Sequence, residues 1–181
     1  MKFLIASDIH GAKAPAEKIM ELFNSGDYDL LLLLGDLLYH GPRNDLPETY
    51  NPKAVIKVLS ALDGKILSVR GNCEAEVDQM VLPFPVLSEC AMVFADGCKI
   101  MMTHGHLHTP EKHPSGIDAF FLGHTHIPVL EKKDGVIYLN PGSVSLPKGG
   151  FPPSYAVWDN GKINVYELWT GKSFLTFPEE S

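Results

Sequence analysis

Cysteine is scarce in this sequence, and long apolar runs are missing. The cysteines among the 181 residues are Cys73, Cys90 and Cys98, and they form no CxxC pair, which excludes a disulfide framework and favours a reducing compartment. Apolar runs such as Leu30–Leu34 are far shorter than the ~18 residues of a membrane-spanning helix. The stretch Phe3–Ala6 is too short for the core of a signal peptide, so we expect a cytoplasmic protein.

Positive charge is also sparse. The chain has 15 Lys and Arg against 22 Asp and Glu, a net charge of −7, and the basic residues form no cluster. This charge balance argues against non-specific binding to nucleic acid or to a membrane surface. The length fits one domain that can bury a hydrophobic core without disulfides or metals as staples. The notable excess is eight histidines, and histidine is a frequent metal ligand.

The first 70 residues predict alternating strands and helices. Segments 2–6, 30–34 and 65–69 are short apolar runs, which are typical of buried strands. Segments 14–24 and 51–62 between them have the apolar spacing of amphipathic helices. This alternation implies a parallel sheet with crossover helices.

The rest of the chain predicts strands joined by tight turns. The turn dipeptides Asp96-Gly97, Asp134-Gly135 and Asn160-Gly161 each separate two apolar segments, as in β-hairpins. We therefore predict an α/β fold with a parallel first sheet and a mixed or antiparallel second sheet. We place a single domain at residues 1–171 and a poorly fixed C-terminal tail at residues 172–181. The strands predicted in this half are 86–95, 99–103, 119–122, 129–133, 136–139, 155–158 and 162–168.

Side chains that can bind metal follow the predicted strands. In open α/β sheets, ligands bind at the carboxyl ends of the strands, so these side chains are expected at one edge. Taken singly, each is also an ordinary turn residue or a solvated loop histidine. Five such strand ends in one small domain favour a shared site over coincidence. The residues are Asp8, His10, Asp36, Asn72, His104, His106, His124 and His126.

The order of these residues resembles the calcineurin-like metallophosphoesterase superfamily, whose signature reads DxH, GD, GN[HC], a later His and GHxH. The resemblance implies a four-layer αββα sandwich of two mixed β-sheets flanked by helices, with a two-metal site at one edge. It also suggests a homo-oligomer, for which the strand-rich second half offers sheet edges. The matching segments are Asp8-Ile9-His10, Gly35-Asp36, Gly71-Asn72-Cys73, His104-Gly105 and Gly123-His124-Thr125-His126.

The resemblance also implies the metal ligands and the reaction. Oxygen and imidazole ligands without thiolate suit Mn, Fe, Ni or Zn, and we expect two divalent ions per chain, with Mn favoured. The implied activity is hydrolysis of a small phosphodiester by in-line attack of a hydroxide that bridges the two metals. The first metal would be held by Asp8, His10, Asp36 and His126. The second would be held by Asp36 as a bridge, and by Asn72, His104 and His124.

Three further residues are candidates for catalysis. Much of the superfamily has His where this chain has Cys73, and a thiol with a pKa near ~8.5 is a weaker proton donor, which favours diesters with good leaving groups. The alternative is that Cys73 is a turn residue without a chemical role. His106 could contact substrate or be a solvated loop residue, and Arg43 could pair with a phosphate oxygen, a surface carboxylate or another subunit.

Two other functions stay open: a phosphomonoesterase of the same fold and a non-catalytic scaffold.

Overall fold

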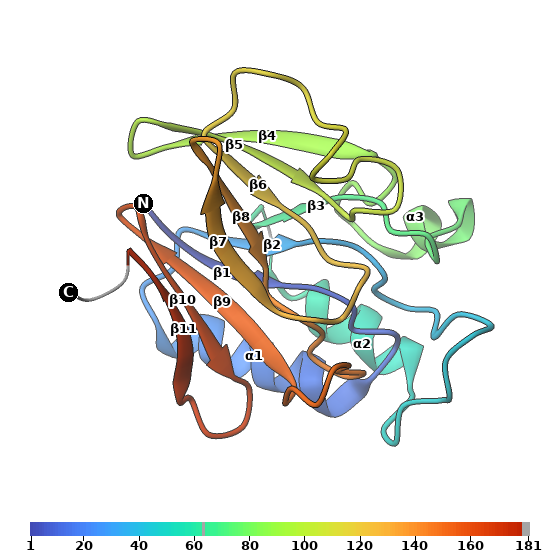
Figure 1. Cartoon of the computed structure of the whole chain (residues 1–181). Coiled ribbons are helices and arrows are strands. Elements are labelled where there is room, and N and C mark those ends of the chain that lie inside the picture. The colour runs from blue at the N-terminus through green and yellow to red at the C-terminus, as the bar shows by residue number, and fades with distance from the viewer. Residues whose placement is uncertain (63, 179–181) are drawn as a thin grey trace.

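In the computed structural model, which describes residues 1–62 and 64–178, two β-sheets stack face to face (Figure 1). The first sheet has the strand order β11-β10-β9-β1-β2-β3. The pairs β1–β2 and β2–β3 are parallel, whereas the pairs that involve β9, β10 and β11 are antiparallel. The strands are β1 (Lys2–Ala6), β2 (Leu30–Leu33), β3 (Ile66–Ser68), β9 (Ser154–Asp159), β10 (Lys162–Glu167) and β11 (Ser173–Phe177).

The second sheet has the order β4-β5-β6-β8-β7 and is mixed as well. Its central pairs β5–β6 and β6–β8 are parallel, and the hairpins β4–β5 and β7–β8 form its two edges. Asp96 and Asp134, in the predicted hairpin turns, have φ values of 52° and 51°, as tight hairpin turns require. The strands are β4 (Cys90–Ala95), β5 (Cys98–Thr103), β6 (Ala119–Phe121), β7 (Val129–Lys133) and β8 (Val136–Asn140).

Of the three helices in the described residues, two cover the outer face of the first sheet (Figure 1). α1 (Lys13–Ser25) and α2 (Pro52–Leu59) pack their apolar faces against β1 and β2, and the short α3 (Glu76–Val81) follows β3. α2 begins where the Asn51 side chain accepts a hydrogen bond from the backbone N–H of Ala54 at 3.1 Å. No helix in the described residues has the length and apolar character needed to cross a bilayer.

The main core lies between the two sheets. In β1, Leu4 faces the helices while Ile5 faces the second sheet, because successive side chains of a strand point to opposite faces. Ile5, Leu32 and Trp158 from the first sheet pack against Phe121 from the second. Strands that are buried on both faces explain the continuous apolar runs in the sequence.

The outer face of the second sheet is covered by a loop instead of helices. Met101, Phe120 and Tyr138 form a small buried cluster there. Residues 104–118 cross over this face without helical structure, and Pro110 and Pro114 oppose helix formation in that segment. The predicted α/β fold of two mixed sheets with flanking helices is confirmed, and α1 and α2 both flank the first sheet. The prediction of a parallel first sheet was wrong, because β9, β10 and β11 from the end of the chain join that sheet in antiparallel pairs.

The predicted C-terminal tail needs correction. Ser173–Phe177 form β11, an edge strand that pairs with β10 through the Ile163–Phe177 and Val165–Leu175 positions. Leu175 and Phe177 also pack against the core between the sheets, so this segment is fixed by apolar contacts as well as by backbone hydrogen bonds. Residues 179–181 of the predicted tail lie outside the described residues.

Candidate metal centre

Five of the seven predicted metal ligands have a left-handed backbone. Residues other than glycine rarely adopt positive φ, and such a conformation costs on the order of 1–3 kcal/mol when it is strained. Each of the five lies in a loop that follows β1, β2 or β6, at the carboxyl edge of its sheet. Concentrated strain at one edge marks a functional site. The φ values are 56° for Asp8, 49° for His10, 56° for Asp36, 67° for His124 and 61° for His126.

Three buried histidines of the site are anchored in the same way. In each ring Nδ1 donates a hydrogen bond to a backbone carbonyl, and Nε2 points into the site. Because a carbonyl can only accept, it fixes the tautomer and leaves a lone pair on Nε2, as in histidines that bind metals. The hydrogen bonds join His10 to Tyr39 O (2.9 Å), His104 to Leu34 O (2.6 Å) and His126 to Leu146 O (2.5 Å).

The two carboxylates are each anchored through one oxygen. Oδ2 of Asp8 accepts hydrogen bonds from the Ser7 hydroxyl at 2.6 Å and from the backbone N–H of His124 at 3.1 Å. Oδ1 of Asp36 accepts from the backbone N–H of Cys73 at 2.9 Å. The second oxygen of Asp8, Oδ1, is buried, and no hydrogen bond reaches it from the described residues. A buried carboxylate oxygen without a partner is costly unless a cation binds it.

The remaining ligand atoms converge on one another. Nε2 of His126 lies 3.2 Å from Oδ1 of Asp8 and 3.2 Å from Nε2 of His10. Oδ2 of Asp36 lies 3.7 Å from Nε2 of His10 and 3.4 Å from Nε2 of His104. Lone pairs that face one another at these distances repel unless a proton or a metal ion lies among them. The residues present therefore fit a metal site.

The structure brings the two remaining predicted ligands to the same place. Oδ1 of Asn72 lies 3.2 Å from Nε2 of His104, and the ring of His124 is centred 5.1 Å from that of His104. In the described residues, potential ligand atoms form three overlapping groups, each within 4.8 Å. The groups are Asp8, His10 and His126; Asp8, Asp36 and His104; and His10, Asp36 and Cys73. All seven residues thus gather at one edge, while their assignment to two individual ions stays a prediction.

The charges within the site shift its pKa values in opposite directions. Burial alone would raise the pKa of Asp8 and Asp36, but the adjacent imidazoles of His10, His126 and His104 favour the charged carboxylates, and the pKa values of both are lowered. Burial alone would lower the pKa of His104, but its hydrogen bond to Asp36 and the two carboxylate charges raise it to about 9. The site therefore stabilises positive charge among these side chains.

Glu74, which the sequence analysis did not single out, holds the loops after β2 and β3 together. This buried carboxylate accepts hydrogen bonds through Oε2 from the backbone N–H groups of Asp36 (2.9 Å) and Gly71 (2.5 Å). Oε1 accepts from the N–H of Leu37 at 2.6 Å. Burial and the charge of Asp36 raise the pKa of Glu74 to about 7. Its position two residues after Asn72 was the sequence signal, but the contacts themselves are visible only in the fold.

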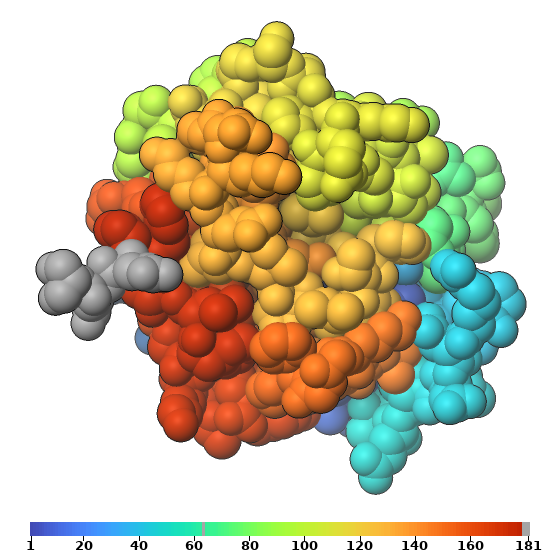
Figure 2. Space-filling view, viewed as in Figure 1, coloured from blue at the N-terminus to red at the C-terminus, as the bar shows by residue number. Residues whose placement is uncertain are grey.

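A cavity of about 330 Å³ opens beside the metal centre. Its lining includes Arg43, Asn44 and Lys148, together with the carboxylate of Asp36. In Figure 2 the loop after β2, drawn in cyan, stands beside the yellow and orange segments, with a hollow between them. Arg43 was a predicted substrate residue, whereas Lys148 was not, because nothing in its local sequence indicates that its loop folds over the site. The cavity can therefore accept an anion.

The two other catalytic candidates also lie at the site. The Cys73 thiol is half-buried and accepts a hydrogen bond from the Asn72 amide at 3.3 Å, and burial together with the Asp36 charge raises its pKa. A thiol in this setting stays protonated, which argues against a nucleophilic thiolate. The ring of His106 is centred 5.4 Å from that of His104, and its buried Nδ1 has no hydrogen bond in the described residues.

Comparison with known proteins places this geometry in context. The family model for the calcineurin-like phosphoesterase superfamily domain matches residues 1–162. The chain is 45% identical over 170 residues to the phosphodiesterase YfcE of Escherichia coli (strain K12), covering 93% of this chain and 92% of that protein. It is 30% identical over 166 residues to the probable metallophosphoesterase YsnB of Bacillus subtilis (strain 168), covering 87% and 83%.

Solved structures agree with the sequence comparison. The structure of the E. coli phosphoesterase YfcE superimposes with a TM-score of 0.95 at 43% identity, over 97% of this chain and 98% of that chain. Vacuolar protein sorting 29 from Cryptosporidium parvum gives a TM-score of 0.69 at 21% identity, over 98% of both chains, and shows a shared fold.

Proposed function

Because the chain belongs to the calcineurin-like phosphoesterase superfamily, we propose that it hydrolyses phosphodiesters at the metal centre described above, with two divalent ions bound there. The activity in the name of the E. coli relative supports the reaction class. The observation that carries the proposal is the unpaired, buried Oδ1 of Asp8 facing the Nε2 atoms of His10 and His126. Three atoms with lone pairs that face one another form an arrangement that a cation satisfies.

The ligand atoms support two ions that share Asp36. Its Oδ2 lies between His10 and His104, and so it can reach both ligand groups. Oxygen and imidazole donors suit Mn, Fe, Ni or Zn, and among these ions we expect Mn. When bound, the ions supply Lewis-acid stabilisation of the phosphoryl group and a lowered pKa of the attacking water. We assign Asp8, His10, Asp36 and His126 to one ion and Asp36, Asn72, His104 and His124 to the other.

Arg43 and Lys148 would bind and orient the phosphate. Both line the cavity beside the ligands, and the Asn44 amide there can donate a further hydrogen bond. The Arg43 guanidinium can donate two parallel hydrogen bonds to non-bridging oxygens, whereas Lys148 provides a point charge. The protein carries a net charge of −7, so these local cations are needed to attract an anionic ester.

Cys73 favours diesters that have good leaving groups. A protonated thiol is a weak hydrogen-bond donor, and Asp36 and burial keep the pKa of Cys73 raised, so proton transfer to a poor leaving group is inefficient. His106 is the other side chain that could donate, because its unpaired Nδ1 lies beside the site. A diester with a phenolate leaving group needs no proton from either Cys73 or His106.

The test is hydrolysis of bis(4-nitrophenyl) phosphate by chelator-treated protein before and after addition of Mn. We expect no turnover without metal, turnover with Mn, and slower hydrolysis of the monoester 4-nitrophenyl phosphate. The Asp8→Asn variant should lose activity, whereas Asp27→Asn should retain it, because Asp27 is an exposed turn residue before the amino end of β2. A preference for the monoester would support a phosphomonoesterase, and inactivity with metals bound would support a non-catalytic scaffold.

We also infer self-association and a cytoplasmic location. Edge strand β4 exposes Met92 and Phe94, which are 39% and 69% accessible, and an apolar sheet edge favours pairing between chains. Free thiols at Cys73, Cys90 and Cys98 support a reducing compartment. Sedimentation equilibrium tests the first inference, and a monomer at micromolar concentration would contradict it.

A further inference from the structure

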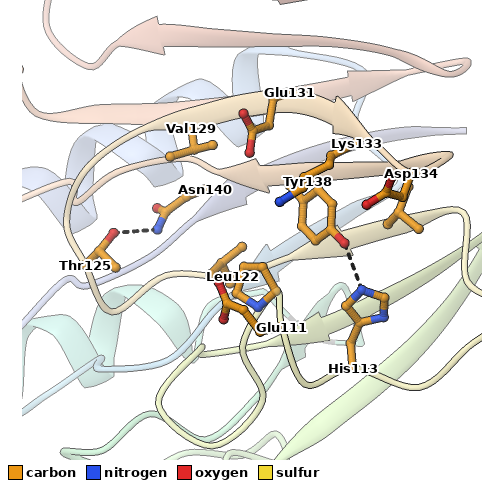
Figure 3. Close-up of a pocket in the computed structure, with 12 residues that line it drawn as sticks. Glu111, His113, Leu122, Thr125, Val129, Glu131, Lys133, Asp134, Tyr138 and Asn140 are labelled. Atoms are coloured by element: carbon orange, nitrogen blue, oxygen red, sulfur yellow. Dashed lines mark hydrogen bonds between the residues drawn. The ribbon is translucent and has the colours of Figure 1, made fainter.

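A second cavity, of about 640 Å³, lies on the outer face of the β7–β8 hairpin (Figure 3). Three cross-strand pairs of this hairpin line it on one side, and the loop around Glu111 and His113 lines it on the other. The size is within the range of small-ligand sites, which is ~300–1,000 Å³. The three pairs are Val129–Asn140, Glu131–Tyr138 and Lys133–Val136.

This groove has an apolar floor and an acidic rim. Leu122 and Tyr138 are nearly buried at its base, and Val129 and Val136 extend the apolar surface. The charged residues of the rim are three carboxylates and one ammonium, so the groove favours a positively charged group. They are Glu111, Glu131, Asp134 and Lys133. The Tyr138 hydroxyl is already hydrogen-bonded to Nε2 of His113 at 2.8 Å, which fixes the aromatic wall (Figure 3).

Thr125 connects the groove to the metal centre. It lines both cavities and stands between His124 and His126, two of the predicted metal ligands. The Asn140 amide donates a hydrogen bond to the Thr125 hydroxyl at 2.9 Å and so fixes the wall that the cavities share (Figure 3). From Val129 to Lys133 the groove follows β7 for four residue steps, or about 13 Å at ~3.3 Å per residue. The groove is therefore long, and one of its lining residues, Thr125, also lines the cavity beside the metal centre.

We propose that this groove binds the second alcohol of the phosphodiester, the one that stays on the phosphate during hydrolysis. The proposal rests on the proposed function, since it assumes that the phosphate lies at the metal centre. The occupant is an elongated, largely apolar chain that carries an amine. Its apolar part covers Leu122, Val129 and Tyr138, and its ammonium lies near Glu111 and Glu131.

The first test varies this alcohol while the leaving group stays the same. The substrates are 4-nitrophenyl phosphates esterified with methyl, octyl, ω-amino-octyl or ω-carboxyheptyl groups, assayed with Mn-loaded protein. We expect kcat/KM to rise roughly tenfold from methyl to octyl because apolar surface is buried, and to rise again for the amine. The ω-carboxyheptyl substrate should not show this increase in kcat/KM. Equal values for all four substrates would overturn the proposal.

Variants separate the groove from general effects of charge and folding. Glu131→Lys should reverse the preference between the amine and the carboxylate, whereas Asp27→Lys makes the same change in charge far from the groove and should leave the preference intact. Val129→Ser should reduce the gain from methyl to octyl. A Glu131→Lys protein that keeps the original preference would contradict the proposal.

A binding measurement with compounds that cannot be hydrolysed tests the groove proposal separately from the proposed function. Calorimetry compares methylphosphonate, octylphosphonate and ω-amino-octylphosphonate, which have no ester bond to hydrolyse. We expect the long phosphonates to bind roughly tenfold more tightly, and Val129→Ser to remove most of that difference. If octylphosphonate binds tightly while no diester is hydrolysed, the proposed function fails and the groove stands. If the three bind equally, the groove proposal fails whatever the activity.

Discussion

The Nε2 atoms of His10 and His126 lie 3.2 Å apart, while Nδ1 of each ring donates a hydrogen bond to a backbone carbonyl. Two lone pairs at this distance repel each other. A proton must therefore lie between the rings in the metal-free protein, and a metal ion can take its place. The same relationship both supports a cation site and identifies a proton that binding should release.

We predict that Mn binding to chelator-treated protein releases protons at neutral pH. Despite burial, the hydrogen bond to Asp8 raises the pKa of His10, and Asp36 raises the pKa of His104 to about 9. The His104 ring holds a proton at pH 7 that the metal displaces, so Mn affinity should increase as pH rises toward 9. Calorimetry in two buffers of different ionisation enthalpy measures the release, and identical heats would contradict this expectation.

The stability of the metal-free protein should fall between about pH 6.5 and pH 9. The folded state raises the pKa of His104 from 6.5 to about 9, so its contribution is complete below pH 6.5 and is lost as pH rises through 9. The loss is on the order of 1–3 kcal/mol. Urea denaturation in chelator across this range measures it. A free energy of unfolding that does not change with pH, or the same pH dependence in the His104→Gln variant, would refute the assignment of this loss to His104.

Glu74→Gln should destabilise the metal-free protein by about 2 kcal/mol and weaken Mn binding. The backbone N–H groups of Asp36, Leu37 and Gly71 donate hydrogen bonds to the two carboxylate oxygens of Glu74. A glutamine has only one oxygen, so its NH₂ group would face at least one of these N–H groups, donor against donor. Urea denaturation and a Mn titration measure the two effects. Glu76→Gln, an exposed neighbour, is the control. Equal stability of the two variants would rule out this role for Glu74.

Cys73→Ala should change the hydrolysis of activated diesters by less than about threefold, because the protonated thiol is neither nucleophile nor efficient acid. Cys73→His should increase kcat/KM for a diester with an alkoxide leaving group, since imidazole, with a pKa near ~6.5, can donate a proton at neutral pH. The gain should be small for a nitrophenolate leaving group. If Cys73→Ala binds both metals and has no activity, the thiol has a catalytic role.

The sequence predicts the elements that local pattern determines. The buried strands β1 and β2 are continuous apolar runs, and their ends carry Asp8 and Asp36, so the site edge follows from strand order alone. The hairpin turns at Asp96 and Asp134 follow from their Asp-Gly dipeptides, which tolerate positive φ. These features depend on neighbours in sequence.

The features that were missed depend on contacts between distant segments. β11 becomes a strand through its partner β10 and its packing on the core, which its short sequence does not reveal. Lys148 reaches the metal cavity because its loop returns there after β8, and Glu74 acts through backbone groups on another loop. The contacts that give Lys148 and Glu74 these roles cannot be read from the neighbouring sequence.

The most direct test of the two-metal phosphodiesterase is to count bound Mn by elemental analysis during a titration that also follows diester hydrolysis. We predict two Mn ions per wild-type chain, with activity appearing as the second ion binds. The Asp36→Asn variant, which weakens the proposed bridge, should lose at least one ion and two or more orders of magnitude in kcat while remaining folded. Full activity in excess chelator, or an Asp36→Asn protein with two ions and normal turnover, would contradict the account.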